Sequence, residues 1–240
     1  MKKIQIGRWL IAGSLALGLG IGGQGRAEDS PLPKEAQELL GKAENARSYR
    51  IRFVLEAKEE DGSLAQVEGL LSFEQPNRRR LELRTKGQEG DSQMIVSDGT
   101  SEWQYYPLTN TVYRLESPPV TPGPHRAFAE VSGGTLRFIQ RLSKNQVALR
   151  RFEAIPLPVV VEGSPVPIKA LRVDVAEEDG FVRELVLLDE KGETVLTQRY
   201  HDLELNPNLA KETFEFTPPE GAQVVELGAG GEPVKEEANR

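Results

Sequence analysis

The pattern of apolar and polar residues along the chain changes its period near residue 49. Before that point, the segment Pro33–Ser48 follows Ser30 and Pro31 and spaces its apolar residues three or four positions apart, which is the spacing of one face of an α-helix. The residues of this face are Ala36, Leu39, Leu40, Ala43 and Ala46. Proline is common in the first helical turn because the N–H that it lacks has no partner there. The sequence therefore predicts an amphipathic helix that packs on an apolar surface.

After Tyr49 apolar and polar residues alternate, which is typical of β-strands with one buried face. Four turn sequences interrupt the alternation: Glu60-Asp61-Gly62-Ser63, Gln75-Pro76-Asn77, Asp98-Gly99 and Pro107–Asn110. With a further break between residues 84 and 93, they leave six predicted strands, within residues 50–57, 65–74, 80–84, 93–97, 102–106 and 111–115. The sequence thus predicts an antiparallel meander with one apolar face.

The second half of the chain is less regular. His125–Val131 and Thr135–Ser143 are predicted to be short helices, and the proline-rich segment Phe152–Ile168 is predicted to be an edge strand or loop, where missing N–H donors do little harm. Strands are predicted again at Ala170–Val175, Arg183–Asp189, Thr194–Leu205 and Phe214–Phe216. Together these elements indicate one α+β domain over residues 28–227, a curved antiparallel sheet with helices on one face. The Gly- and charge-rich residues 228–240 are predicted to be a disordered tail.

Residues 1–27 are typical of a cleaved signal peptide. Lys2, Lys3 and Arg8 precede the charge-free run Trp9–Gly23, and small residues follow near Ala27, where a signal peptidase would cut. A retained membrane anchor is the alternative, but the run is shorter than the ~20 residues that span hydrocarbon. We therefore expect an exported mature chain that begins near Glu28 in an extracytoplasmic compartment.

The charge and the lack of reactive side chains narrow the function. The chain has 30 basic and 37 acidic residues and a net charge of -7, which disfavours nucleic-acid binding. It has no cysteine, so disulfides, thiol catalysis and thiolate metal sites are excluded. His125 and His201 stand far apart without a metal or hydrolase motif around them. We expect no enzyme, no metal and no cofactor.

A one-sided apolar sheet of this extent must be covered, because large exposed apolar patches are rare on soluble monomers. Helices could fill it as an ordinary core, or incomplete filling could leave a hydrophobic cavity. The residue pattern alone leaves both alternatives open.

Three segments resemble a known family. Gly69–Asn77 is similar to the "G-x-L-x-x-x-x-P" hairpin of LolA-like periplasmic outer-membrane lipoprotein carriers, and Ile95–Pro107 to their "lvsDGxxlWxYxP" segment. Phe214–Ala222 resembles the "FxFxpPxGv" strand and exit of these carriers. The three motifs stand in the family's order, and the resemblance covers Leu32–Val225.

The resemblance implies an incomplete, unclosed antiparallel β-barrel with an α-helical lid, around a cavity for the acyl chains of lipoproteins. The apolar residues expected to line this cavity are Phe53, Leu55, Val67, Leu71, Phe73, Leu81, Leu83, Trp103 and Tyr105. The lid residues would be Ala36, Leu39, Leu40 and Ala43. Such a monomeric carrier takes acylated lipoproteins from an inner-membrane ABC transporter to an outer-membrane receptor. The alternative is a lipid-binding or sensory periplasmic module of the same fold without a trafficking role.

One position departs from the family pattern. These carriers have an arginine just before the hairpin proline, where it bonds to the lid, whereas this chain has Gln75 before Pro76. Three arginines follow at residues 78–80, but none of them stands at that latch position. We therefore expect a looser lid, or one that is held by apolar packing.

Overall fold

The computed structural model describes residues 32–59, 61–87, 92–116, 136–154 and 168–228. The predicted signal peptide, the predicted helix His125–Val131 and most of the proline-rich segment and of the tail lie outside these residues. The helices are α2 (Lys34–Ala43) and the 3₁₀ turns η1 (Pro107–Thr109) and η2 (Lys211–Phe214). The strands are β1 (Ser48–Lys58), β2 (Leu64–Glu74), β3 (Arg78–Thr85), β4 (Gln93–Ser97), β5 (Ser101–Tyr106), β6 (Thr111–Glu116), β7 (Leu136–Lys144), β8 (Val147–Ala154), β9 (Ile168–Ala176), β10 (Val182–Asp189), β11 (Thr194–Leu205) and β12 (Gln223–Leu227).

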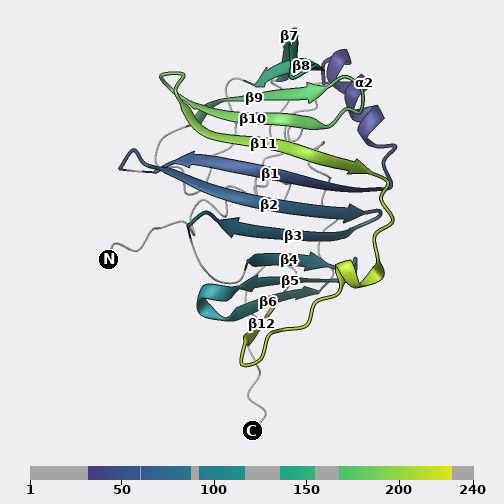
Figure 1. Ribbon diagram of the computed structural model, residues 1–240, viewed down its shortest axis with the longest axis vertical. Helices are drawn as coiled ribbons and strands as arrows, with labels where there is room; N and C mark the ends of the chain where they lie inside the picture. Colours follow the sequence, from purple (N-terminus) through teal and green to yellow (C-terminus); the bar gives the residue numbers. More distant parts are fainter. Residues whose placement is uncertain (1–31, 60, 88–91, 117–135, 155–167, 229–240) are drawn as a thin grey trace. The chain divides into compact units, whose positions relative to one another are not determined.

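These strands form one open sheet in the order β12-β6-β5-β4-β3-β2-β1-β11-β10-β9-β8-β7 (Figure 1). The pairs are antiparallel in the meanders, and β12 joins β6 in parallel. In the described part of the chain, α2 is the one α-helix. No helix of that part is long and apolar enough to cross a membrane.

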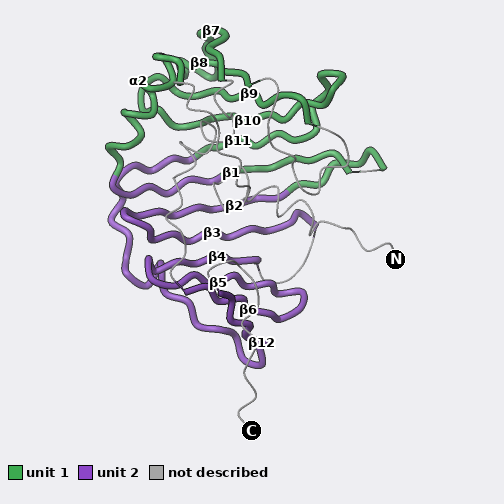
Figure 2. Tube along the Cα trace, turned by 180° about the vertical axis from the view of Figure 1, so that it is seen from behind, with its two compact units in different colours: residues 1–46, 53–66, 121–201 green, residues 47–52, 67–120, 202–240 purple. Residues whose placement is uncertain are grey.

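The chain divides into two compact units (Figure 2). Unit 1 comprises residues 1–46, 53–66 and 121–201, and unit 2 comprises residues 47–52, 67–120 and 202–240. Strands β1, β2 and β11 contribute residues to both units.

In unit 1, α2 forms as predicted but is shorter than its sequence pattern suggests. Its buried face is Ala36, Leu39, Leu40 and Ala43, and Glu44 caps its end. Ala46, the fifth residue of the predicted stripe, is buried beyond the helix. The helix ends early because the chain is already extended at Ser48, where β1 begins.

The helix predicted at Thr135–Ser143 is wrong, because Leu136–Lys144 forms strand β7, which pairs antiparallel with β8. Asn145 and Gln146 connect the two strands with φ angles of 51° and 66°, the left-handed backbone that two-residue hairpin turns require. Ile139, a member of the supposed helical face, is largely exposed. The i, i+3 spacing of apolar residues here was too short a pattern to identify a helix.

The predicted meander is confirmed as strands β1–β6, of which β3–β6 lie wholly in unit 2. Strand β4 has the predicted bounds, and residues 75–77 turn the chain between β2 and β3. The last strand was predicted in the wrong place: Phe214 ends the 3₁₀ turn η2, and the final strand is Gln223–Leu227. Neither phenylalanine lies in a strand: the Arg78 guanidinium lies 5.2 Å from the Phe214 ring, and the Phe216 ring contacts the rings of Trp103 and Tyr105 in β5.

Candidate functional site

Unit 2 has an extended apolar face. The strand register places Leu71 opposite Leu81, and Leu81 opposite Ile95. Residues that are direct partners in an antiparallel pair lie on the same face of the sheet. These three side chains and Leu83, two residues further along β3, are buried. Val67 and the half-buried Phe73 of β2 share this face, and Phe73 stacks on Tyr49 at 5.1 Å.

Trp103 and Tyr105 do not belong to that face, which corrects the sequence prediction. Their partners in β4 are Val96 and Met94, which alternate with Ile95. The β4–β5 turn sets this pairing, because it brings Ser97 opposite Glu102. Phe216 covers the two aromatic rings on the opposite face, at centroid distances of 6.4 and 6.2 Å.

The remaining two predicted cavity residues lie in unit 1. Phe53 and Leu55 are buried on one face of β1. The ring of Phe53 contacts the ring of Tyr200 at 5.8 Å, and burial raises the pKa of the Tyr200 hydroxyl above its ordinary value.

The predicted lid helix is fastened to the β8–β10 region of its own unit. Gly180, in the β9–β10 turn, lies so close to α2 that a Cβ atom there would be 2.0 Å from the carbonyl oxygen of Leu39. Arg150 of β8 donates hydrogen bonds to Glu38 at 2.8 Å and to the carbonyl of Glu35 at 3.3 Å. The hydrogen bond from Arg150 lowers the pKa of Glu38. Lys42 at the end of the helix donates to the carbonyl of Glu177.

The latch position Gln75 lies in the exposed turn between β2 and β3. Its backbone N–H donates to the carbonyl of Arg47 at 2.9 Å, within unit 2. This contact fixes the turn through the main chain, independently of the side chain at position 75.

Sequence reasoning missed one charged pair on the apolar face of unit 2. Arg79 and Glu102 form an ion pair whose side chains are only 8% and 4% exposed. Arg79 is opposite Phe73 in β2 and precedes Leu81 by two positions. The alternation of β3 could have revealed the buried arginine, because Arg79 stands two residues before Leu81 and therefore on the same, apolar face of the strand.

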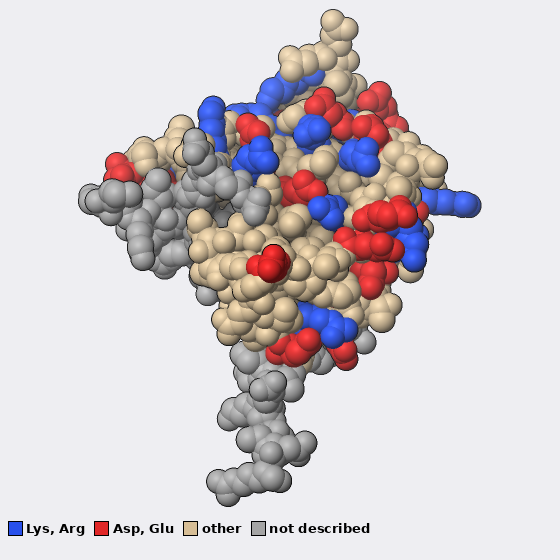
Figure 3. All heavy atoms as spheres, turned by 60° about the horizontal axis from the view of Figure 1, so that its bottom comes forward, with Lys and Arg blue, Asp and Glu red and all other residues tan. Residues whose placement is uncertain are grey.

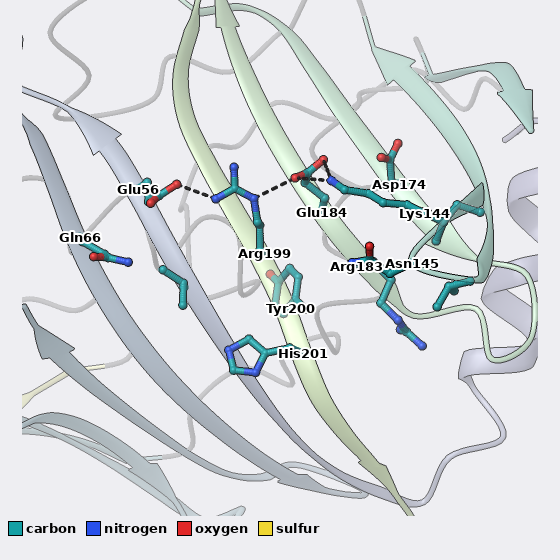
Figure 4. A pocket seen from close by; sticks show the side chains of 13 residues that line it. Glu56, Gln66, Lys144, Asn145, Asp174, Arg183, Glu184, Arg199, Tyr200 and His201 are labelled. Carbon is teal, nitrogen blue, oxygen red and sulfur yellow. Dashed lines mark hydrogen bonds and ion pairs between the residues drawn. The ribbon is translucent and has the colours of Figure 1, made fainter. Parts of the chain in front are cut away.

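A second polar cluster lies in a pocket of about 560 Å³ in unit 1 (Figure 4). Arg199 donates to Glu56 at 2.6 Å and to Glu184 at 3.0 Å, and Lys144 donates to Glu184 at 3.0 Å. Burial opposes the charge on Glu184, but the hydrogen bonds from Lys144 and Arg199 outweigh it and lower its pKa. Acids and bases alternate in this chain of contacts, so their charges are compensated and the cluster ties neighbouring strands together.

Charges are mixed on the surface as well. On the face in Figure 3, basic and acidic side chains are interspersed next to an area with few charged side chains. Within the described ranges, no group of three or more His, Cys, Asp or Glu residues could hold a metal ion.

No family model matches the chain. An outer-membrane lipoprotein carrier protein of Alkalilimnicola ehrlichii is 31% identical over 210 residues, which cover 84% of this chain and 91% of the relative. The chain belongs to the outer-membrane lipoprotein carrier family. The resemblance found in the three sequence motifs is thereby confirmed.

Two further proteins are similar along most of their length. A lipoprotein carrier protein of Pseudoalteromonas translucida is 21% identical over 202 residues, covering 82% of this chain and 89% of the relative. The crystal structure of a conserved protein from Thermus thermophilus superimposes with a TM-score of 0.55 at 16% identity, over 80% of this chain and 99% of that one. The latter shares the fold of this member of the carrier family.

Proposed function

We propose that the protein is a periplasmic carrier that binds the acyl chains of lipoproteins in a hydrophobic cavity and takes them towards the outer membrane. The observation that carries the proposal is the buried apolar face of unit 2 in a chain of the lipoprotein carrier family. The proposed lining there is Val67, Leu71, Phe73, Leu81 and Leu83.

Acyl binding needs apolar surface and no catalytic group. Burial of a hydrocarbon chain contributes about 0.8 kcal/mol per CH₂, so one long chain contributes on the order of 10 kcal/mol. We therefore propose a monomeric carrier without enzymatic activity, exported by the signal peptide in residues 1–27. Its proposed partners are acylated lipoproteins or lipids, an inner-membrane ABC transporter and an outer-membrane receptor.

The direct test is mass spectrometry of the protein purified from its own periplasm without detergent. A carrier should be recovered with acylated lipoproteins. Recovery of lipid alone would favour the sensory module, and recovery of neither would contradict acyl binding. The same spectra report the amino terminus, which we expect at Glu28.

A pair of variants tests the apolar face. Leu71 is buried on this face, whereas Leu70 is half-buried on the opposite face, where it pairs with Glu82. We expect Leu71→Asp to abolish binding of a fluorescent acyl probe or to destabilise the fold, because it replaces a buried apolar side chain by a carboxylate that is costly to desolvate. Leu70→Asp should retain binding. If Leu71→Asp folds and binds like the wild type, the face has been assigned wrongly.

A further inference from the structure

A polar pair interrupts the apolar face of unit 2. Arg79 lies opposite Ser97, and Ser97 lies opposite Glu102, so that all three residues share the face of Leu81 and Ile95. The carboxylate of Glu102 accepts hydrogen bonds at both oxygens, one from the Arg79 Nη2 and one from Gln104 Nε2 at 2.8 Å. Both carboxylate oxygens of Glu102 therefore have a hydrogen-bond donor.

The guanidinium of Arg79 is not satisfied in the same way. Its Nε and Nη1 atoms are buried and have no hydrogen-bond partner within the described ranges of the chain. Buried donors are nearly always paired in native proteins, because leaving them unpaired costs the full desolvation of the group. Two donor groups of one buried side chain thus lack an acceptor among the residues that the structure describes, and they suit an acceptor on a ligand.

The neighbouring acid decides which acceptor suits them. Glu102 already compensates the charge of Arg79, so an incoming carboxylate would approach a second, unscreened carboxylate in a buried site. A neutral carbonyl oxygen accepts from the same donors without that repulsion. Esters and amides, which attach acyl chains to lipoproteins, provide such an oxygen.

We propose that Arg79 donates hydrogen bonds to the ester or amide carbonyl of a bound acyl group. The inference rests on the proposed acyl-binding function and specifies the polar end of the ligand. With a rise of about 3.4 Å per residue, Leu81 and Leu83 follow Arg79 on the same face at about 7 and 14 Å. A chain held at its carbonyl by Arg79 then runs along these apolar side chains.

Two lipids that differ by one carbonyl test the proposal. 1-Monolauroylglycerol is an ester, and 1-O-dodecylglycerol is the ether with the same head group; each would displace a fluorescent acyl probe below its critical micelle concentration. We expect the wild type to bind the ester at least roughly tenfold more tightly, because hydrogen bonds to a charged donor are among the stronger ones.

Two variants test whether the preference for the ester depends on Arg79. Arg79→Met/Glu102→Leu removes both charges at once and so leaves no unpaired acid; it should bind ester and ether equally. Arg80→Gln is the matched control, because Arg80 points to the opposite face and pairs with Glu82. It should keep the preference for the ester.

The outcomes separate this inference from the proposed function. Equal affinity of the wild type for ester and ether would overturn the role of Arg79 while leaving acyl binding intact. Laurate binding far more tightly than the ester would overturn the neutral-carbonyl assignment. Failure of the wild type to bind the probe or either lipid would reject the proposed function and this inference with it.

Discussion

The contribution of the contact between α2 and the β9–β10 turn to stability can be measured by adding a methyl group at Gly180. Gly180 has a φ of +77°, and an added Cβ would lie 2.0 Å from the oxygen and 2.9 Å from the carbon of the Leu39 carbonyl. Both contacts are with backbone atoms, which cannot turn aside as a flexible side chain would. Gly180→Ala therefore forces either the turn or the helix to move.

The expected loss has two parts. A left-handed backbone costs an L-residue about 1–2 kcal/mol, and overpacking costs typically about 1–3 kcal/mol. Gly180→Ala should thus destabilise the protein by about 2–5 kcal/mol. Gly192 supplies a matched control, because its φ is +79° but a Cβ there would meet nothing within 4 Å. Gly192→Ala should cost only the backbone part, about 1–2 kcal/mol.

Urea unfolding of the two variants measures the difference between their free energies of unfolding, provided that the dependence of this free energy on urea concentration has the same slope in both. That difference isolates the contact between α2 and the turn, which any opening of the proposed lid would have to break. If both alanine variants lose the same free energy of unfolding, α2 does not rest on Gly180 and the close approach is wrong.

Four further experiments follow from the same structure. Leu81→Ala should cost about 2–5 kcal/mol of stability in urea unfolding because its side chain is fully buried, whereas Leu108→Ala, at an exposed position, should change it by less than ~0.5 kcal/mol. Gln75→Arg should slow the release of a bound fluorescent fatty acid if position 75 controls the lid, and equal release rates in two folded proteins would exclude that control. The lowered pKa of Glu184 contributes stability above an unfolded pKa of about 4.3 that is lost as the pH falls, so Glu184→Gln should flatten the acid limb of a stability profile. The raised pKa of Tyr200 contributes stability below about pH 10 that is lost as the pH rises, and absorbance titration should show a tyrosine that ionises only on unfolding.

The meander of unit 2 was predictable because two independent signals agreed. Alternation fixes which residues share a face within one strand, and turn sequences such as Gln75-Pro76-Asn77 fix where strands end. The same agreement held for β9, β10 and β11. Where the turn signal was weak, as at Asn145-Gln146, the hairpin was missed and a helix was predicted in its place.

The composition of the apolar face was harder to predict than its strands. Alternation shows which residues of one strand share a face, but not which face they share with the next strand after a turn. Trp103 and Tyr105 were therefore assigned to the face that Glu102 occupies. Only the register decides this, and the register depends on how the β4–β5 turn closes. The correction matters for function, because it replaces two aromatic residues of the expected cavity by one half of a charged pair.

The buried pair itself is poorly explained by stability alone. Apolar residues of similar volume in place of a buried ion pair are often neutral or stabilising by about 1–4 kcal/mol, whereas loss of one partner costs about 3–5 kcal/mol. Arg79→Met/Glu102→Leu should therefore unfold at the same or a higher urea concentration than the wild type, and Glu102→Leu alone at a much lower one. A double variant less stable than the wild type by more than ~2 kcal/mol would mean that the pair is needed for the fold. Retained stability together with a lost preference for the ester would leave ligand recognition as the reason for a charge on an apolar face.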